Sequence, residues 1–231
     1  TKVIFDKESR KEILRRIDDC LRRGALSQGQ NVKKFEEKWS NYVGTKYAIA
    51  VNSGSSAIEI SMRILGVKDK EVLVPVNTFV ATTTGVMLAG GKVRFVDIDP
   101  NTLSISLKSL KNKISEKTVG VIIVHIGGII TPEIKAIKKW CVEKGLWLFE
   151  DCAHAHGSAL DGKCAGTFGI AGGYSFFATK VITAGEGGMI VTNNSNFADN
   201  ARLLRNHGKP KPWISYYTHI GSNWRMTEIN A

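Results

Sequence analysis

The sequence predicts an α/β protein whose central sheet is mostly parallel and buried. Short segments rich in Val and Ile alternate with helical patterns along the chain, as in residues 118–126 followed by residues 132–145. Strands buried on both faces read as continuous apolar runs, and parallel strands need a crossover connection that is usually helical. With 231 residues and 43% hydrophobic composition, the chain can bury one substantial core or two small ones.

The helical segments are recognised by their apolar periodicity and their stop signals. The first, residues 7–24, places Ile13, Leu14, Ile17 and Leu21 on one face of an otherwise charged helix. The second covers residues 31–44 and ends at Gly44, and further helices are expected at residues 55–65, 82–88, 107–114 and 132–145. In the last of these, Pro132 suits the first turn and Gly145 the stop. Strands are expected at residues 47–52, 71–76, 92–98, 118–126, 146–151, 172–178 and 187–192.

The charge and cysteine content narrow the class of protein. A net charge of +11 is compatible with nucleic acid, an anionic membrane surface or a phosphorylated small molecule as partner. The basic clusters at residues 7–23 and 108–117 are not interleaved with aromatic side chains, so we expect no nucleic-acid partner. No apolar run is long enough to span a membrane, and the charged N-terminus does not resemble a signal peptide. The four scattered cysteines favour reduced thiols in a cytoplasmic protein.

The first candidate site follows a predicted strand, where ligands of parallel α/β sheets bind. In VNSGSSAIEI, residues 51–60, a strand is followed by Ser53-Gly54-Ser55-Ser56 and then by a helix. Gly54 allows a tight turn, and the free N–H groups of a helix N-terminus suit a phosphate. Serine and glycine also cap ordinary helices, so this stretch alone leaves both interpretations open.

The second candidate site is LWLFEDCAHAHG, residues 146–157, in which Glu150 and Asp151 end an apolar strand. Burying a carboxylate without a partner is expensive, so an acid facing a cationic ligand and a helix cap are the two interpretations. His154 and His156 raise the question of a metal, but no third ligand follows at a suitable spacing. We therefore expect no metal site.

The third candidate site is SFFATKVITAGEGGMIVT, residues 175–192, with Lys180 between an apolar run and a glycine-rich loop. Alone, such a lysine is an ordinary surface residue. A phosphate cradle, an acid at one strand end and a lysine at a later one are, together, what pyridoxal 5'-phosphate requires. The lysine amine forms a Schiff base with the cofactor aldehyde, and the carboxylate keeps the pyridine nitrogen protonated. The ordered set predicts a site for this cofactor.

These motifs resemble the DegT/DnrJ/EryC1/StrS family of fold-type-I, pyridoxal-phosphate-dependent sugar aminotransferases. The resemblance covers nearly the whole chain, through GQNVKKFEEKWSNYVGTKYAIAVNSGSSAIEI, VPVNTFVATTTGVMLAGGKVRFVDIDPNTLSI, EDCAHAHGS, TKVITAGEGGMIVTNN and GSNWRMTEINA in that order. It implies a three-layer α/β/α large domain with a mostly parallel sheet, formed by residues 1–231 and including the N-terminal helices. Family members continue into a smaller domain that helps to close the site. The chain is therefore expected to be a fragment without that domain.

The resemblance also implies roles for the residues around the cofactor ring. Lys180 matches the Schiff-base lysine, which also moves a proton between the substrate α-carbon and cofactor C4′, and Asp151 matches the acid at the pyridine nitrogen. His154 stands where the family often has a glutamine beside the phenolic oxygen. Phe79 matches an aromatic residue that stacks on the ring, with core packing as the alternative.

At the other end of the cofactor, the resemblance implies a phosphate site shared between two subunits. Gly54, Ser55 and Ser56 match the phosphate loop, and Ser175 matches a serine whose hydroxyl adds a further bond. Asn223 matches an asparagine that reaches the phosphate of the neighbouring subunit, which implies a homodimer with shared active sites. Departures occur at residues 125–128, HIGG where the family often has HLYG, and in SFFATK, where it often has SFHPTK.

The resemblance implies transfer of an amino group from glutamate or glutamine to a nucleotide-linked keto-sugar in amino-sugar biosynthesis. A keto-cyclitol acceptor is one alternative, and dehydration of a sugar by a lyase with the same cofactor is another. Relatives that dehydrate sugars replace the lysine with histidine, so Lys180 argues against the lyase. An inactive fragment or a non-catalytic relative is the remaining alternative.

Overall fold

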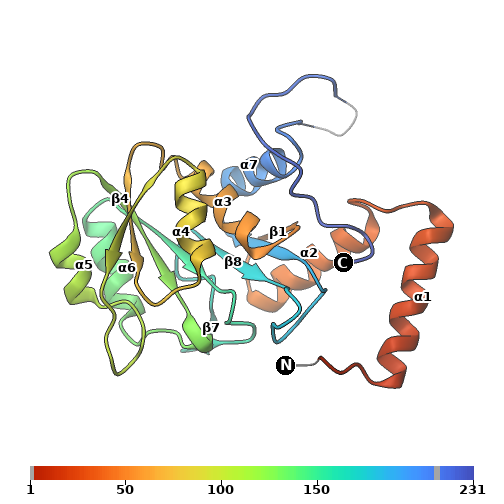
Figure 1. The fold of residues 1–231 in the computed structure, drawn as a ribbon, viewed down its shortest axis with the longest axis horizontal. Coiled ribbons are helices and arrows are strands. Elements are labelled where there is room, and N and C mark those ends of the chain that lie inside the picture. The colour runs from red at the N-terminus through yellow and green to blue at the C-terminus, as the bar shows by residue number, and fades with distance from the viewer. Residues whose placement is uncertain (1–2, 211–213) are drawn as a thin grey trace.

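The fold is built on a seven-stranded sheet in the order β1-β9-β8-β5-β4-β2-β3. It is seen in a computed structural model that describes residues 3–210 and 214–231 (Figure 1). The strands are β1 (Tyr47–Val51), β2 (Glu71–Pro75), β3 (Lys92–Val96), β4 (Thr118–Val124), β5 (Trp147–Asp151), β8 (Ala171–Ser175) and β9 (Gly188–Thr192). The pairs from β8 to β3 are parallel, whereas β9 lies antiparallel between β1 and β8. The predicted mostly parallel sheet is confirmed.

Helices cover both faces of this sheet, and one further helix lies apart from it. The helices are α1 (Lys7–Arg23), which lies apart, α2 (Gln30–Val43), α3 (Gly54–Ile64), α4 (Val80–Leu88), α5 (Leu107–Lys113), α6 (Ile134–Glu143) and α7 (Ser195–Arg205), with a short 3₁₀ turn η1 (Ile126–Gly128). The helix α7 and a small hairpin of β6 (Ala159–Leu160) and β7 (Lys163–Cys164) were not among the predicted elements. The strands of the hairpin have only two residues each, too few for alternation to mark them, whereas α7 carries Phe197, Ala201 and Leu204 at helical spacing and could have been recognised.

Strand alternation divides the apolar core into two layers. In β1, Ile49 and Val51 belong to one buried cluster with residues of α3, α4 and α7. Ala48 and Ala50 point the other way, into a second cluster with residues of α2, α5 and α6. Successive side chains of a strand face opposite sides of its sheet, so one sheet separates two helical layers. The three-layer α/β/α arrangement implied by the sequence is confirmed.

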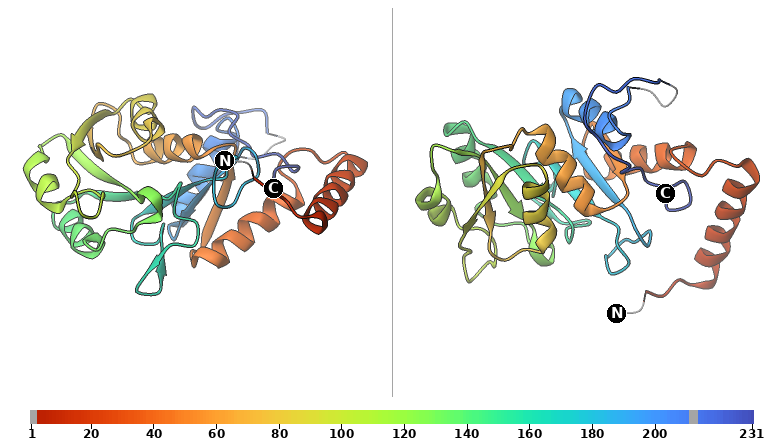
Figure 2. Two further views of the ribbon diagram at one scale, coloured as in Figure 1. Left: turned by 60° about the horizontal axis from the view of Figure 1, so that its bottom comes forward. Right: turned by 45° about the horizontal axis from the view of Figure 1, so that its top comes forward.

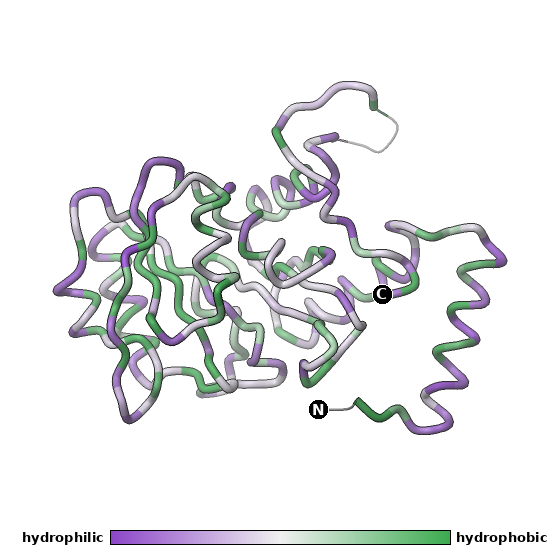
Figure 3. Tube along the Cα trace, in the orientation of Figure 1, coloured by the Kyte–Doolittle hydropathy of each residue, from purple (hydrophilic) through white to green (hydrophobic). Residues whose placement is uncertain are grey.

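The N-terminal helix α1 stands away from the body of the domain (Figures 1 and 2). Its N-cap is Asp6, whose side chain accepts a hydrogen bond from the Ser9 N–H at 2.8 Å. Of its apolar residues, Leu14 is 65% exposed and only Cys20 is buried. Figure 3 shows apolar and polar residues alternating along this helix. No helix among the described residues has the length and apolar character needed to cross a membrane.

Several predicted boundaries are confirmed, and others are shifted by a few residues. Gly44 ends α2 with φ +83°, and Gly145 follows α6 with φ +67°, both in the left-handed region that glycine adopts without strain. Pro132 lies in a turn before α6, which begins at Ile134, and not in its first turn. The strand expected at residues 172–178 ends at Ser175, because the chain then turns toward Lys180.

The C-terminal segment is tied to α2 by one buried carboxylate. Glu228 is 1% exposed and accepts backbone hydrogen bonds from Gly29 at 2.6 Å, Asn31 at 2.9 Å and Val32 at 2.9 Å. An anion that accepts from the first N–H groups of a helix also opposes the helix dipole. Next to it, the Thr227 hydroxyl oxygen accepts a hydrogen bond from the Asn230 N–H at 3.1 Å, which closes a turn.

Candidate active site

A cavity of about 510 Å³ opens at the carboxyl ends of β4, β5 and β8. Its lining brings together seven of the nine predicted site residues: Gly54, Ser55, Phe79, Asp151, His154, Ser175 and Lys180. The strand β1 runs parallel to β8 on the far side of β9, so the start of α3 reaches the same edge. The three stretches that the sequence singled out therefore meet at one site, as expected for a parallel sheet.

The start of α3 forms a narrow polar cradle on one wall of this cavity. Ser53 is the N-cap, and its Oγ accepts from the Ser56 N–H at 3.1 Å. The N–H groups of Gly54 and Ser55 lie before the first intrahelical hydrogen bond, which the Ala57 N–H donates. This helix N-terminus therefore suits an anion. A Cβ at Gly54 would lie 2.8 Å from the Cβ of Ser175, so glycine is what allows this approach.

Ser56 lies behind the cradle and does not line the cavity. Its side chain is buried, and its hydroxyl donates a hydrogen bond to the Asn52 Oδ1 atom. The Asn52 Nδ2 atom donates in turn to the backbone oxygen of Asn223 at 3.3 Å. Ser56 thus braces the loop through its hydroxyl, while its neighbours present their backbone N–H groups. Asn52 was not singled out in the sequence, although it directly precedes the motif.

Asp151 is held at the end of β5 by two hydrogen bonds. Its side chain accepts from the Thr82 hydroxyl through Oδ2 at 2.7 Å and from the Ala153 N–H through Oδ1 at 3.1 Å. The residue is 5% exposed and lines the cavity. A buried carboxylate with both oxygens bonded is oriented, and it offers a negative charge to a cationic group in the cavity. The alternative role of helix cap does not apply, since the chain enters turns after β5 and the next helix, α7, begins only at Ser195.

Lys180 lies in the turn that follows β8 and is half-buried at the cavity. Burial lowers the pKa of its amine below the ordinary value of 10.5, and the negative charge of Asp151 acts in the opposite direction. A lysine with a lowered pKa has more of its amine in the neutral, nucleophilic form at a given pH. Lys180 is therefore a partly desolvated amine that shares a cavity with an oriented acid.

His154 and Phe79 complete the wall around the amine and the acid. The Gly127 N–H donates to the Nδ1 atom of His154 at 3.3 Å, so the neutral ring carries its proton on Nε2. Burial, followed by the charge of Lys180, lowers the pKa of His154 below 6.5 and favours that neutral form. Phe79 is 69% exposed and lines the cavity, which rules out its alternative role as a core residue.

Asn223 lies outside the cavity of its own chain. It is exposed, and its segment runs beside the end of β1, where the Asn52 N–H donates to the Trp224 oxygen at 2.9 Å. The neighbouring Arg225 donates to the Asn206 side chain at 2.8 Å and does not line the cavity either. The sequence prediction that Asn223 serves another subunit remains a prediction.

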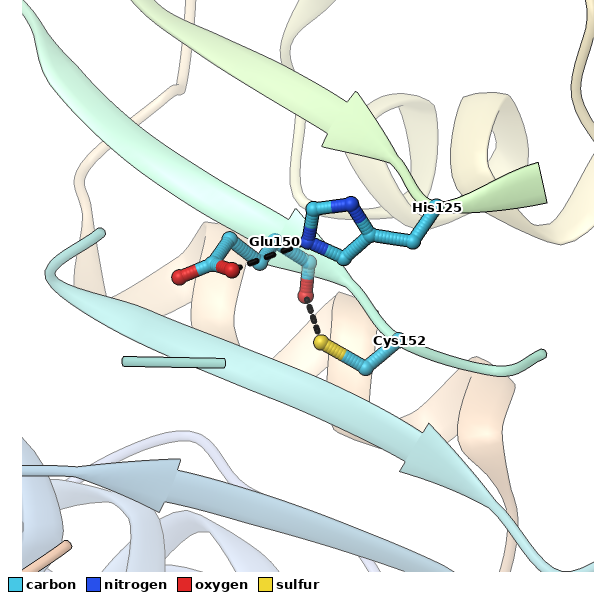
Figure 4. Close-up of side chains that lie close together, drawn as sticks. All are labelled: His125, Glu150 and Cys152. Atoms are coloured by element: carbon cyan, nitrogen blue, oxygen red, sulfur yellow. Dashed lines mark hydrogen bonds and ion pairs between the residues drawn. The ribbon is translucent and has the colours of Figure 1, made fainter. Parts of the chain in front are cut away.

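Behind the cavity, Glu150 anchors a loop with its fully buried side chain. Its Oε2 atom lies 2.9 Å from His125 Nε2 and 2.7 Å from the Gly166 nitrogen (Figure 4). Its Oε1 atom accepts from the Phe168 and Gly169 N–H groups, each at 2.7 Å. Alternation along β5 sends Glu150 and Asp151 to opposite faces, and only the second lines the cavity. Although they are adjacent in the sequence, Glu150 holds a loop and Asp151 faces the cavity.

His125, Glu150 and Cys152 form the one group within residues 3–210 and 214–231 whose ligand atoms lie close enough to hold a metal. Both carboxylate oxygens of Glu150 are already engaged twice, and the Cys152 thiol faces the Glu150 backbone oxygen (Figure 4). Burial raises the pKa of Cys152 well above 9.0, whereas a metal ligand must be a thiolate. The cluster is thus a structural hydrogen-bond network.

Thr82, like Asn52, is a residue of the site that the sequence analysis missed. It lies in the quoted stretch NTFVATTTG, but threonines in a helix have no spacing that marks a contact with a strand end 69 residues away. Only the packing of α4 on the sheet brings its hydroxyl to Asp151.

Comparison with known proteins agrees with this geometry. The DegT/DnrJ/EryC1/StrS aminotransferase family matches residues 7–231. A GDP-perosamine synthase of Vibrio cholerae is 36% identical over 217 residues, which are 93% of this chain and 59% of the relative. The chain thus spans about three fifths of that relative's length.

Two solved structures share the fold over nearly the whole chain. Helicobacter pylori PseC, an aminotransferase involved in pseudoaminic acid biosynthesis, superposes with a TM-score of 0.91 at 31% identity, covering 100% of this chain and 62% of PseC. An E. coli GDP-4-keto-6-deoxy-D-mannose-3-dehydratase with bound hydrated pyridoxal phosphate superposes with a TM-score of 0.89 at 27% identity, covering 100% of this chain and 64% of that one. With the match over residues 7–231, these similarities show that the chain belongs to the DegT/DnrJ/EryC1/StrS aminotransferase family.

Proposed function

We propose that residues 7–231 form the cofactor-binding large domain of a pyridoxal-phosphate-dependent aminotransferase. The observation that carries this proposal is the meeting of Lys180 and Asp151 in one cavity beside a helix N-terminus. Family membership supports it, because the related solved structures include one with pyridoxal phosphate bound. The chain spans about three fifths of the length of the GDP-perosamine synthase, so the aminotransferase activity is itself part of the proposal.

The residues of the cavity fit the cofactor from end to end. The phosphate would be held by the N–H groups of Gly54 and Ser55 and by the Ser175 hydroxyl, in a cradle that a Cβ at Gly54 would fill. Ser56 would support this loop from behind. A dianionic phosphate also suits the N-terminus of α3, because the dipole of this 11-residue helix has its positive end there.

At the other end of the cavity, four side chains would act on the pyridine ring or its substituents. When bound, the cofactor supplies an electron sink for a substrate carbanion. Lys180 would attach the cofactor through its neutral amine and move a proton at Nζ, and Asp151 would hold a proton on the pyridine nitrogen. His154 would donate from Nε2 to the phenolic oxygen, and Phe79 would cover one face of the ring.

The acceptor that the relatives support is a nucleotide-linked keto-sugar, with glutamate or glutamine as the amino donor. Two relatives support this part of the proposal, a GDP-perosamine synthase and an aminotransferase involved in the biosynthesis of pseudoaminic acid. The second candidate is sugar dehydration, because a dehydratase shares the fold. Lys180 favours transamination, since a lysine amine can both attach the cofactor and move a proton between the substrate α-carbon and cofactor C4′.

Absorbance spectroscopy of the chain with pyridoxal phosphate tests the proposal. We expect a visible band from cofactor bound at Lys180, and we expect glutamate or glutamine to replace it with the band of the pyridoxamine form. A visible band that ignores both donors would favour the dehydratase. The absence of any visible band would contradict the proposed cofactor domain.

We propose further that two chains share their active sites through Asn223. Its exposed position outside its own cavity leaves its side chain available to a second copy. We expect Asn223→Ala to weaken retention of pyridoxal phosphate. In a mixed dimer with Lys180→Ala, one of the two sites has both residues, so tight retention should return at that site. Verified mixed dimers that recover no tight site would count against sharing.

A further inference from the structure

A short chain of hydroxyl groups runs from the start of α4 to the acid of the cavity. The Thr82 Oγ1 atom lies 2.7 Å from the Asp151 Oδ2 atom, and the Thr78 Oγ1 atom lies 2.7 Å from Thr82 Oγ1. A carboxylate only accepts hydrogen bonds, so Thr82 spends its single proton on Asp151. Its oxygen is then the acceptor for Thr78. The chain is polarised toward the carboxylate.

Burial makes this contact strong and fixes its geometry. Thr82 is 0% exposed and Asp151 is 5% exposed, so water does not compete for either group. A hydrogen bond to a charged group is about twice as strong as a neutral one. Together with the Ala153 N–H on Oδ1, the Thr82 hydroxyl leaves each carboxylate oxygen with a fixed donor. The plane of the Asp151 carboxylate is therefore set by its surroundings before any ligand arrives.

The same turn of α4 also carries Phe79. The Thr82 N–H donates to the Phe79 oxygen at 3.1 Å, and Thr78 precedes Phe79 directly. Farther along α4, a Cβ at Gly85 would lie 2.6 Å from Ile58 Cγ2 of α3, so the two helices pack at unusually close range. The helix α4 thus has little freedom to move relative to the cradle at the start of α3.

We propose that Thr82 is a positioning residue that orients Asp151 toward the cofactor ring, with Thr78 orienting Thr82. The first turn of α4 then sets two contacts with the ring together, the acid at its nitrogen and the aromatic residue on its face. This inference rests on the proposed function, because it assigns the ring of pyridoxal phosphate to this part of the cavity. It adds a residue that acts through Asp151 and does not touch the cofactor.

The test compares three variants of neighbouring threonines. Thr82→Val keeps the shape and removes the hydroxyl, and Thr82→Ser restores a hydroxyl. Thr83→Val is the matched control, because Thr83 does not line the cavity and its hydroxyl donates to the Val80 oxygen at 2.7 Å. The readouts are the dissociation constant of pyridoxal phosphate and the pH midpoint of its visible band. Circular dichroism establishes that each variant is folded.

We expect Thr82→Val to weaken cofactor binding by about tenfold, because an Asp151 side chain that is no longer held in place must be ordered when the ring binds. Without the donated bond, the carboxylate neutralises more of the positive charge on the ring, so the pH midpoint should rise. Thr82→Ser should restore both quantities, and Thr83→Val should match the wild type. If Thr82→Val does not fold, Thr78→Val supplies the test, with a smaller effect in the same direction.

Two results would overturn the inference while leaving the proposed function intact. One is a Thr82→Val protein whose affinity and midpoint match those of Thr83→Val. The other is a Thr82→Ser protein that behaves like Thr82→Val, which would assign a packing role to the methyl group. If the wild-type chain itself shows no visible band, the proposed function fails and the inference fails with it.

Discussion

Lys180→Ala is expected to abolish the covalent adduct that borohydride traps between the chain and pyridoxal phosphate. The amine of Lys180 lines the cavity that holds Asp151, and burial lowers its pKa, which favours the nucleophilic form. Alanine removes both the attachment point and the proton carrier. We expect transamination to fall by roughly 10²–10⁴-fold or more, the range for loss of a positioned proton-transfer group. Mass spectrometry of the borohydride-reduced protein identifies the modified lysine, and the fraction of modified chains measures how much of the adduct is lost.

Lysines that lie elsewhere provide the control for this experiment. Lys163→Ala removes an exposed amine from β7 and should leave the trapped adduct unchanged. Lys180→Arg keeps a positive charge in the cavity, but a guanidinium remains protonated and should give no adduct. Because the pKa of Lys180 is lowered, adduct formation by the wild type should rise with pH around a midpoint below 10.5. An undiminished adduct in Lys180→Ala would move the attachment to another lysine.

Glu150→Gln is expected to have the largest effect on stability among conservative changes at the site. The Glu150 carboxylate is fully buried and is bonded by His125 and by three backbone N–H groups. Glutamine has nearly the same shape, but its NH₂ group would face donors that now meet an oxygen. Losing the charge and leaving buried donors unpaired should lower the free energy of unfolding by roughly 3–5 kcal/mol. Urea titration followed by circular dichroism measures this change.

The matched control is another glutamate on the same protein. Glu116 is exposed, and Glu116→Gln should change the free energy of unfolding by less than about 0.5 kcal/mol. A Glu150→Gln protein as stable as Glu116→Gln would show that the network around Glu150 is not a stabilising one. A normal content of secondary structure in Glu150→Gln at low urea would confirm that the comparison starts from a folded state.

Much of the fold and of the site follows from local patterns. The apolar runs of β1 and β4 are long enough and buried enough to read as strands, and Gly44 and Gly145 mark helix ends because they adopt positive φ. Gly54, Asp151 and Lys180 could be predicted to lie together because each stands at or after a strand end, and parallel strands end at one edge. Phe79, His154, Ser175 and Asn223 followed only from the family resemblance. The side of the sheet that each residue faces also follows from alternation, which separates Glu150 from Asp151.

Contacts between distant segments were decided by the tertiary structure alone. Thr82 reaches Asp151 across 69 positions, and Glu228 caps α2 across 199 positions from Gly29. The antiparallel insertion of β9 between β1 and β8 likewise has no local signature, because a buried strand reads the same in either direction. Sequence periodicity reports what each segment buries. Which buried group meets which partner depends on how the helices and strands pack, and that is a property of the whole chain.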